Sequence, residues 1–187
     1  MSHKVILVGD TAVGKTSLIT RFMEDPFSDR TISTMSPVFV KTTVDVNGES
    51  VPIEIWDTAG QEAYRSLMTV YYRGAEVAML CFTKETADRN QEWVDTVRQV
   101  EPSCAIVLIL TKDDLLESEE RDELLNDLGG KKKQWQAGDV VVTSAKSGQG
   151  VREAFTSAAA CVVGNELMGQ AISLSDQHAA KKESGCC

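Results

Sequence analysis

Short apolar runs alternate along the chain with longer segments that repeat apolar side chains at helical spacing. The short runs are rich in β-branched residues and end near Gly, Pro, Asn or Asp, which is typical of buried strands. The predicted strands are 5–8, 38–46, 51–56, 77–82, 105–110 and 140–142. The longer segments predict helices at 15–23, 88–100 and 150–163, and an acidic segment predicts another at 118–128. We expect Gly129 and Gly130 to end that acidic helix.

Asn47 and Gly48 separate the second and third predicted strands. Both residues tolerate positive φ angles, so the pair predicts a tight hairpin between antiparallel strands. Elsewhere strands alternate with helices, which predicts right-handed crossovers between parallel strands. The expected fold class is therefore α/β, with a six-stranded, mostly parallel sheet covered by helices on both faces in three layers. Ligands bind to such sheets at the carboxyl ends of the strands.

The composition is that of an acidic globular protein. The 187 residues include 28 acidic and 19 basic side chains, with a formal net charge of −9, and 42% of them are hydrophobic. This balance argues against nucleic-acid binding, which needs a basic surface, and against a disordered or fibrous chain. No apolar run approaches the roughly 20 residues of a membrane-spanning helix, and no secretory signal is recognisable, so we expect a cytoplasmic protein. One domain is expected at 1–163, followed by a flexible, polar tail at 164–187.

Three cysteines lie among apolar residues and predict buried, reduced thiols: Cys81, Cys104 and Cys161. The chain has two histidines, His3 and His178, and each is isolated in the sequence. Since neither residue type is clustered, we expect no zinc site.

Residues 9–16 match the phosphate-binding pattern G-x-x-x-x-G-K-[ST] between a predicted strand and a predicted helix. Glycines in such a loop let backbone N–H groups point at phosphates, and the helix amino terminus adds favourable partial charge. Lys15 would reach the β- and γ-phosphates, and the Thr16 hydroxyl would be a ligand of Mg²⁺. The predicted nucleotide-binding residues of this segment are Thr11, Ala12, Val13, Gly14, Lys15, Thr16 and Ser17.

Asp57 follows an apolar strand and begins the sequence Asp-Thr-Ala-Gly-Gln. A carboxylate at a strand end can hold Mg²⁺, usually through water. The Gly60 N–H could meet a γ-phosphate, and the Gln61 amide could orient an attacking water molecule. Gln61 is therefore the candidate catalytic residue.

Two polar segments, 111–114 and 143–146, each follow an apolar strand and together predict a base-binding site. The Asp114 carboxylate can accept hydrogen bonds from guanine N1–H and the 2-amino group. Adenine offers neither donor, and such a mismatch can discriminate by about 10⁴-fold or more. The aliphatic stems of Lys112 and Lys146 could sandwich the base. The residues predicted to contact the nucleoside are Thr111, Lys112, Asp114, Ser144, Ala145 and Lys146.

Taken together, these motifs resemble those of a Ras-superfamily small GTPase, most like the Rab family. The similarity to Rab proteins is carried by W-D-T-A-G-Q-E at 56–62, Y-R-S at 64–66 and Y-Y-R-G-A at 71–75, and it covers about residues 3–163. The resemblance implies the small G domain of P-loop NTPases, a cycle between GTP and GDP with Mg²⁺ as cofactor, and two switch loops that order around the γ-phosphate.

The resemblance also implies roles for two loop residues. Thr34 corresponds to the switch I threonine that covers Mg²⁺ and the γ-phosphate, which makes Thr16, Thr34 and Asp57 the implied metal ligands. Phe27 falls where the family places an aromatic ring against guanine, although a Phe that plugs the core is the alternative.

Three departures from the family pattern bear on function. Thr11 and Ala12 replace the glycine pair seen in Ras, which suggests slow intrinsic hydrolysis. Ser36-Pro37 stiffens switch I and removes a backbone donor, so the choice of effector is open. Thr111 replaces the usual Asn, but its hydroxyl can still form a hydrogen bond across the site.

Cys186 and Cys187 resemble the double-cysteine terminus of Rab proteins, where both cysteines carry geranylgeranyl groups. Two lipid chains give stable membrane attachment, whereas one is marginal. The resemblance thus places the chain on the cytosolic face of an endomembrane. A basic run at 131–133 is interpreted as a solvated loop, with a partner or membrane contact as the alternative.

The resulting hypothesis is a monomeric, membrane-attached GTPase switch in vesicle trafficking that binds no nucleic acid. The implied partners are an exchange factor, a GTPase-activating protein, a GDP-dissociation inhibitor, a prenylation escort, and effectors that bind switch I and switch II. A P-loop ATPase or nucleotide kinase is one alternative, which Asp114 argues against. A nucleotide-stabilised scaffold with little useful hydrolysis is another, which Thr11 and Ala12 favour and Gln61 disfavours.

Overall fold

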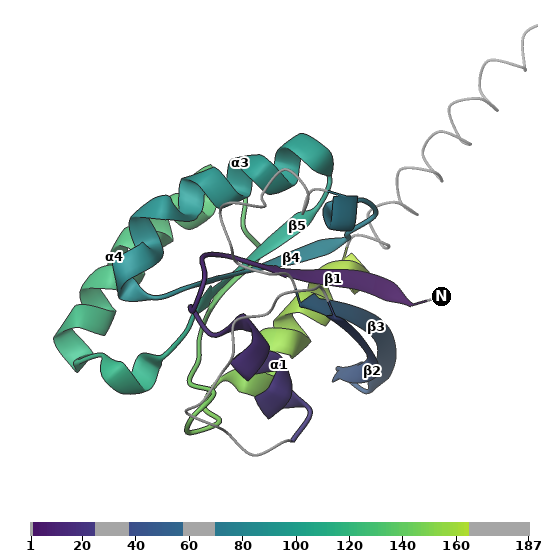
Figure 1. Cartoon of the computed structure of the whole chain (residues 1–187), viewed down its shortest axis with the longest axis horizontal. Helices are drawn as coiled ribbons and strands as arrows, with labels where there is room; N and C mark the ends of the chain where they lie inside the picture. Colours follow the sequence, from purple (N-terminus) through teal and green to yellow (C-terminus); the bar gives the residue numbers. More distant parts are fainter. Residues whose placement is uncertain (1, 25–37, 58–69, 165–187) are drawn as a thin grey trace, which may run out of the picture.

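The computed structural model describes residues 2–24, 38–57 and 70–164 (Figure 1). Within these ranges one sheet of six strands has the order β2-β3-β1-β4-β5-β6. β2 is antiparallel to β3, and all other neighbouring strands are parallel. The predicted six-stranded, mostly parallel sheet is confirmed. The strands are β1 (His3–Val8), β2 (Val38–Val46), β3 (Glu49–Asp57), β4 (Val77–Phe82), β5 (Ala105–Leu110) and β6 (Asp139–Val142).

The predicted hairpin turn joins β2 to β3. Asn47 and Gly48 have φ angles of 55° and 88°, so both occupy the left-handed region that a two-residue hairpin turn requires. The Gly48 N–H donates to Asp45 Oδ1 at 3.1 Å, which closes the turn. β3 continues one residue beyond the predicted strand, so Asp57 pairs with Leu7 of β1. The carboxylate of Asp57 is thereby fixed at the edge where β1 leads into the loop at 9–14.

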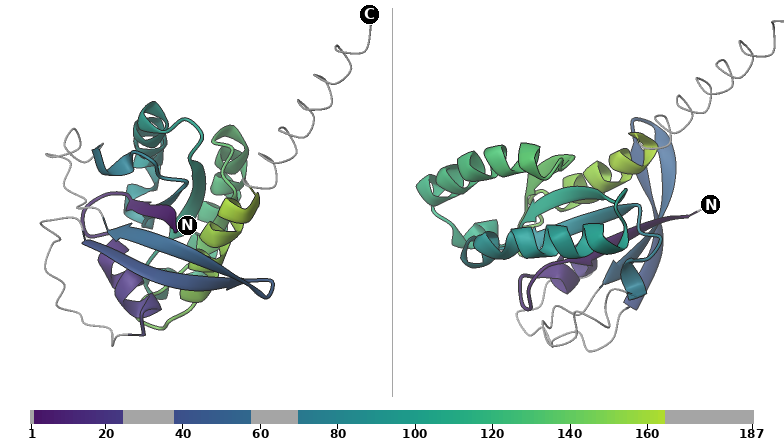
Figure 2. Two further views of the ribbon diagram at one scale, coloured as in Figure 1. Left: turned by 90° about the vertical axis from the view of Figure 1, so that its right-hand side faces the viewer. Right: turned by 90° about the horizontal axis from the view of Figure 1, so that it is seen from above.

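Helices cover both faces of the sheet (Figures 1 and 2). Val5 and Leu7 of β1 belong to a core cluster with Leu18 of α1 and with the helix at 151–164. The alternate residues of β1 belong to a second cluster with Trp93 of α3 and Leu128 of α4. The predicted three-layer arrangement follows from this alternation. The described helices are α1 (Lys15–Phe22), the helical residues 70–72, η2 (Lys84–Arg89), α3 (Asn90–Val100), η3 (Asp113–Leu115), α4 (Ser118–Gln134) and the helix at 151–164.

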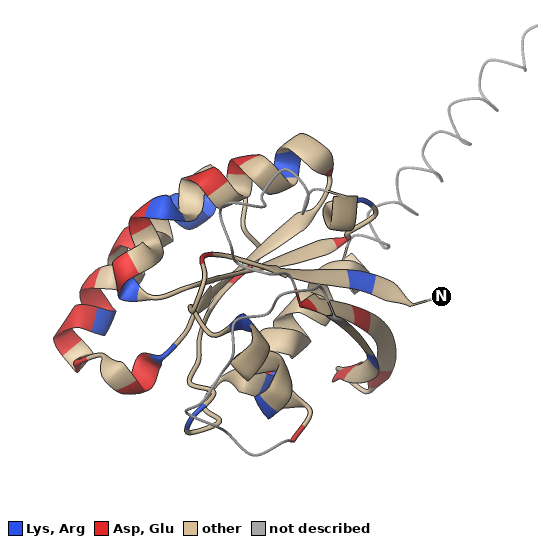
Figure 3. Cartoon of the chain, in the orientation of Figure 1, with Lys and Arg blue, Asp and Glu red and all other residues tan. Residues whose placement is uncertain are grey.

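α4 runs through the glycine pair that was expected to end it, so that prediction is wrong. A Cβ atom added at Gly129 or Gly130 would meet nothing within 4 Å, so each glycine costs only its helix propensity, about 1 kcal/mol. Continuing the helix lets Leu128 and Trp135, 0% and 4% exposed, pack in the core. The basic run at 131–133 therefore lies in the last helical turn rather than in a loop, where positive charge complements the helix dipole (Figure 3).

The three described cysteines are free thiols. Burial raises the pKa of the Cys81 and Cys104 thiols to about 12, so both stay protonated at neutral pH. Cys161 is only half-buried, and partial burial raises its pKa too. No helix in the described ranges combines the length and apolar character needed to cross a bilayer.

Candidate functional site

The loop at 9–14 joins β1 to α1 in a conformation that depends on glycine. Gly9 has a φ angle of 134°, and a Cβ atom there would lie 2.0 Å from the carbonyl oxygen of Cys81. The loop therefore passes too close to β4 for any side chain at this position. Ala12 also has a positive φ angle, 62°, so this departure from glycine keeps the left-handed backbone. Thr11 and Ala12 are exposed, so the outer side of the loop is open.

Lys15 is the first residue of α1 and is 5% exposed. Its ammonium group donates to the carbonyl oxygens of Gly9 and Asp10, both at 2.8 Å. The loop thus curls around the lysine nitrogen, and the positive charge lies where the loop would enclose phosphates. Val13 is buried, and Gly14 in a left-handed conformation caps α1.

Asp10 anchors this loop to the opposite side of the sheet, and sequence reasoning missed this contact. The Asp10 carboxylate is buried, accepts a hydrogen bond from the Trp93 indole N–H at 2.8 Å, and lies 2.8 Å from Arg89 Nη1. Trp93 lies on α3 and Arg89 ends η2. The indole N–H is the donor that a buried Trp needs, but nothing in the sequence names its partner 83 residues away.

Thr16 and Asp57 meet at the edge of the sheet beside the loop. The Thr16 hydroxyl donates to Asp57 Oδ2 at 2.6 Å, and Asp57 is 6% exposed at the end of β3. A hydroxyl and a carboxylate are hard oxygen ligands of the kind that Mg²⁺ prefers. The donor set therefore fits the predicted metal site. Ser17, the remaining residue of the segment, follows within α1 and is half-buried.

Thr111 ties the second loop region to the first. Its Oγ1 lies 2.6 Å from the carbonyl oxygen of Val13 and 2.9 Å from that of Phe82. The residue that replaces the family's Asn therefore bridges the loop after β5, the phosphate loop and the end of β4. The two predicted halves of the site are in direct contact through this side chain.

The segments 111–114 and 143–150 lie together at the carboxyl ends of β5 and β6. The Ser144 hydroxyl donates to Asp114 Oδ1 at 2.6 Å, and the Thr143 carbonyl accepts from the Asp113 N–H at 3.1 Å. Gly150 closes the second segment with a φ angle of 66°, and a Cβ atom there would lie 2.0 Å from the Val142 carbonyl oxygen.

Four residues of this base-side group are open to a ligand. Lys112, Asp114 and Lys146 are exposed, and Ala145 is half-buried. The structure therefore brings the predicted nucleoside contacts together at one edge of the sheet. Other predicted residues lie outside the described ranges: Phe27, Thr34, Gly60, Gln61, Cys186 and Cys187.

A family model described as "Ras family" matches residues 4–163. The chain belongs to the Ras family. It is 32% identical to "Ras-related protein SEC4" of Saccharomyces cerevisiae, over 98% of this chain and 90% of the relative. It is 37% identical to "Ras-related protein Rab-13" of Bos taurus, over 83% of this chain and 77% of the relative. It is 33% identical to "GTP-binding protein ypt5" of Schizosaccharomyces pombe, over 100% of this chain and 93% of the relative.

These relatives confirm the Rab-like resemblance within the Ras superfamily. The sheet order, the loop after β1 and the family match together confirm the expected small G domain of P-loop NTPases. Ras-family proteins bind guanine nucleotides and hydrolyse GTP, so this chain is a small GTPase. The ATPase and nucleotide kinase alternative is thereby set aside.

A row of three aromatic side chains on β2, β3 and the helical residues 70–72 was not anticipated as a functional surface; Trp56 and Tyr71 are partly buried. We call Phe39, Trp56 and Tyr71 the aromatic strip: the Phe39 and Trp56 ring centroids lie 5.1 Å apart, and those of Trp56 and Tyr71 lie 6.1 Å apart. Phe39 is 50% exposed, which is unusual for so large an apolar side chain. The hairpin turn could have revealed this contact, because counting back from it pairs Phe39 with Trp56.

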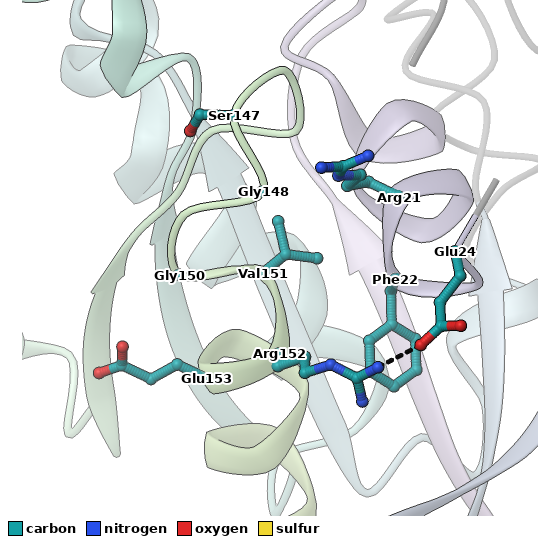
Figure 4. A pocket seen from close by; sticks show the side chains of 9 residues that line it. All are labelled: Arg21, Phe22, Glu24, Ser147, Gly148, Gly150, Val151, Arg152 and Glu153. Atoms are coloured by element: carbon teal, nitrogen blue, oxygen red, sulfur yellow. Dashed lines mark hydrogen bonds and ion pairs between the residues drawn. The ribbon is translucent and has the colours of Figure 1, made fainter. Parts of the chain in front are cut away.

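A pocket of about 510 Å³ lies between α1 and the start of the helix at 151–164 (Figure 4). Arg21 lies beside Gly148, and Arg152 pairs with Glu24 at the rim. None of the predicted nucleotide-binding residues in the described ranges lines this pocket. It is therefore a pocket between α1 and the 143–150 segment and no part of the candidate nucleotide site.

Proposed function

We propose that this Rab-like GTPase works as a membrane-attached switch in vesicle trafficking. It binds one guanine nucleotide, GTP or GDP, across the two halves of the site. The observation that carries the proposal is the contact of Thr111 with the carbonyl oxygens of Val13 and Phe82. This contact joins the candidate phosphate-binding loop at 9–14 to the candidate guanine-binding segment at 111–114. A single nucleotide can therefore span both halves.

On the phosphate side, Lys15 and the backbone N–H groups at 11–17 hold the phosphates. Lys15 is already directed at the loop interior by the Gly9 and Asp10 carbonyls. Thr16 and Asp57 would hold Mg²⁺, with Thr34 as the switch I ligand that the resemblance implies. When bound, Mg²⁺ supplies positive charge that neutralises the β- and γ-phosphates.

On the base side, Asp114 accepts hydrogen bonds from guanine N1–H and the 2-amino group. Ser144 fixes the direction of that carboxylate through the 2.6 Å bond to Oδ1. Ala145 N–H donates to guanine O6, and Lys112 and Lys146 cover the faces of the base together with Phe27. A guanine ligand satisfies these polar groups and an adenine ligand leaves them unpaired.

Hydrolysis depends on Gln61, which orients the attacking water, and Gly60 donates to the γ-phosphate. We expect slow intrinsic turnover, because Thr11 and Ala12 line the exposed side of the loop and a GTPase-activating protein is needed to complete the site. Loss of the γ-phosphate releases residues 28–37 and 60–72, which is the output of the switch.

Effectors dock on the aromatic strip. Phe39 follows the predicted switch I, Trp56 precedes the predicted switch II, and Tyr71 lies within switch II, residues 60–72. Exposed aromatic side chains contribute much of the energy at protein interfaces. A partner that contacts the strip therefore also contacts both switches and can distinguish the GTP state from the GDP state.

The tail at 164–187 attaches the G domain at 1–163 to membranes. Geranylgeranyl groups on Cys186 and Cys187 provide two lipid chains, enough for stable binding to the cytosolic face of an endomembrane. An exchange factor, a GDP-dissociation inhibitor and a prenylation escort complete the cycle, and the protein acts as a monomer between these encounters.

Single-turnover GTP hydrolysis tests this proposal against the scaffold alternative, which the exposed Thr11 and Ala12 favour. The variants are Gln61→Leu and, as a matched control at an exposed glutamine far from the site, Gln134→Leu. The switch proposal expects slow hydrolysis by the wild type, a clear loss with Gln61→Leu and no change with Gln134→Leu. Equal, negligible rates for all three proteins would support the scaffold and contradict a catalytic role of Gln61.

A further inference from the structure

Asp113 is a buried carboxylate that the proposed function does not use. Its side chain is 3% exposed, and it lies between Lys112 and Asp114, two residues that the proposed function directs at the base. Charged side chains are almost never buried without a partner. Its partner is Arg121, in the first turn of α4.

Arg121 binds both oxygens of Asp113. Its Nε donates to Oδ1, and its Nη2 donates to Oδ2 at 2.9 Å. Such a two-point contact fixes the plane of the carboxylate as well as its position. Hydrogen bonding to Asp113 also raises the pKa of the Arg121 guanidinium, which stays charged under all ordinary conditions.

The turn that carries Asp114 is held in place through two groups of Asp113, its backbone N–H and its side-chain carboxylate. The Asp113 N–H donates to the Thr143 carbonyl at 3.1 Å, and its carboxylate is held by Arg121. The preceding residue, Lys112, has a φ angle of 57°, so the chain enters the turn in a left-handed conformation that needs external support. Asp114 projects from the fixed turn with its carboxylate exposed to a ligand and bonded to Ser144.

We propose that Arg121 is a positioning residue for guanine recognition: by holding Asp113 it fixes the turn that carries Asp114, and from that turn the Asp114 carboxylate reaches both Ser144 and the base. This inference rests on the proposed function, because it requires Asp114 to read the base. It differs from a purely structural role, in which the ion pair only fastens α4 to the sheet. Removing Arg121 leaves the buried Asp113 carboxylate without its ion-pair partner, which favours a shift of the turn toward water.

The test compares the dissociation rates of GDP and IDP, since inosine lacks the 2-amino group that Asp114 reads. The proteins are the wild type, Arg121→Ala and Arg121→Lys, with Lys131→Ala as the matched control. Lys131 is also a cation on α4 and pairs with Asp127 at 2.6 Å, away from the base-side loops. Circular dichroism of each GDP-bound protein verifies folding.

The wild type is expected to release IDP faster than GDP. Arg121→Ala should accelerate GDP release roughly tenfold, as the loss of a charged hydrogen-bond partner allows, and should accelerate IDP release less. The ratio of the two rates therefore falls toward one. Arg121→Lys should lie between, because an ammonium group keeps the charge but not the two-point geometry. Lys131→Ala should match the wild type.

An unchanged ratio of IDP to GDP release in Arg121→Ala, with lower thermal stability, would overturn the inference and leave a structural ion pair. If Arg121→Ala does not fold, Arg121→Lys and Asp113→Asn carry the same comparison, and an unchanged ratio in both overturns it. A wild type that does not prefer GDP to IDP contradicts the assignment of Asp114 in the proposed function, a failure visible before any variant is measured.

Discussion

The proposed phosphate side of the site comes from one continuous stretch of chain, residues 9–17, whereas the proposed base side is assembled from 111–114 and 143–150. On the phosphate side the backbone itself is shaped by glycine and wraps Lys15. On the base side, side chains hold two separate loops together, with Ser144 bonded to Asp114. A continuous motif carries its geometry with it, whereas an assembled one depends on contacts that the rest of the fold supplies.

Each side contains a buried aspartate that side chains from neighbouring helices bind. These helices are η2 and α3 on the phosphate side, and α4 on the base side. Asp10 is bound by the Trp93 indole and Arg89, and Asp113 is bound by Arg121. The indole is neutral and buried, so Asp10 is held by a hydrogen bond as well as by charge. We therefore expect the two sides to fail separately, each with its own kinetic signature.

Asp114→Ala is expected to have the largest effect and to act on the base side alone. Preference for GDP over ADP should fall by about 10⁴-fold, because the guanine donors lose their acceptor. Competition binding against a fluorescent GDP analogue measures the preference. Asp127→Ala, which removes an exposed carboxylate on α4, is the control and should change nothing. A retained preference for guanine would show that the base is read elsewhere.

Lys15→Ala should have the opposite pattern: the affinity for nucleotide falls, and the preference for guanine is kept. Affinity for GDP should fall roughly 100-fold, the scale of a lost charged hydrogen bond, because the buried ammonium group no longer meets the phosphates. The preference for guanine over adenine should survive in whatever binding remains. The same competition assay measures both quantities, with Lys132→Ala as the control. Normal affinity in Lys15→Ala would remove the phosphate loop from the site.

Trp93→Phe tests the hydrogen bond that holds Asp10 of the phosphate loop. Losing the indole donor to Asp10 should accelerate GDP and IDP release alike, roughly tenfold, because the buried carboxylate loses one partner. Trp135→Phe is the matched control, since Trp135 is equally buried and its indole donates at 2.6 Å to Gln91, away from the loop. A change in the ratio of IDP to GDP release in Trp93→Phe would contradict the separation of the two sides.

Substitution of the α4 glycines should have the smallest effect, on stability alone. Gly129→Ala and Gly130→Ala should each raise the free energy of unfolding by about 0.5–1 kcal/mol, because the new Cβ meets nothing within 4 Å. Gly138→Ala is the contrasting control: its Cβ would lie 2.8 Å from Cys161 Sγ, which would have to shift, so no gain in stability is expected. Urea unfolding measures the three, and nucleotide release should be unchanged in the first two. Destabilisation by both α4 substitutions would contradict the continuous helix.

The sequence predicted the sheet well because its strands are bounded by sharp signals. The strands at 38–46 and 105–110 match their predicted limits, and Asn47-Gly48 gave the correct turn. The helix at 118–128 was predicted too short, because a glycine pair normally ends a helix unless tertiary packing compensates. Here Leu128 and Trp135 supply that packing.

The tertiary contacts that hold Asp10 and Asp113 could not be predicted from the sequence. Trp93 lies within the predicted helix at 88–100, but periodicity says nothing about which acceptor its indole N–H meets. Asp113 lies between two predicted nucleoside contacts, Lys112 and Asp114, and only the fold brings Arg121 onto it. Local motifs therefore predict which groups can contact the nucleotide, and tertiary contacts determine how firmly those groups are held.

Nucleotide release from the purified protein tests the central claim most directly, that one guanine nucleotide spans both sides of the site. A fluorescent GDP analogue is bound in Mg²⁺, and its release is followed after addition of excess GTP, GDP or ATP, with and without EDTA. We predict slow release in Mg²⁺, rapid release in EDTA, and replacement by GTP and GDP but not by ATP. Replacement of the analogue by ATP as readily as by GTP, or a release rate that EDTA does not change, would contradict the account.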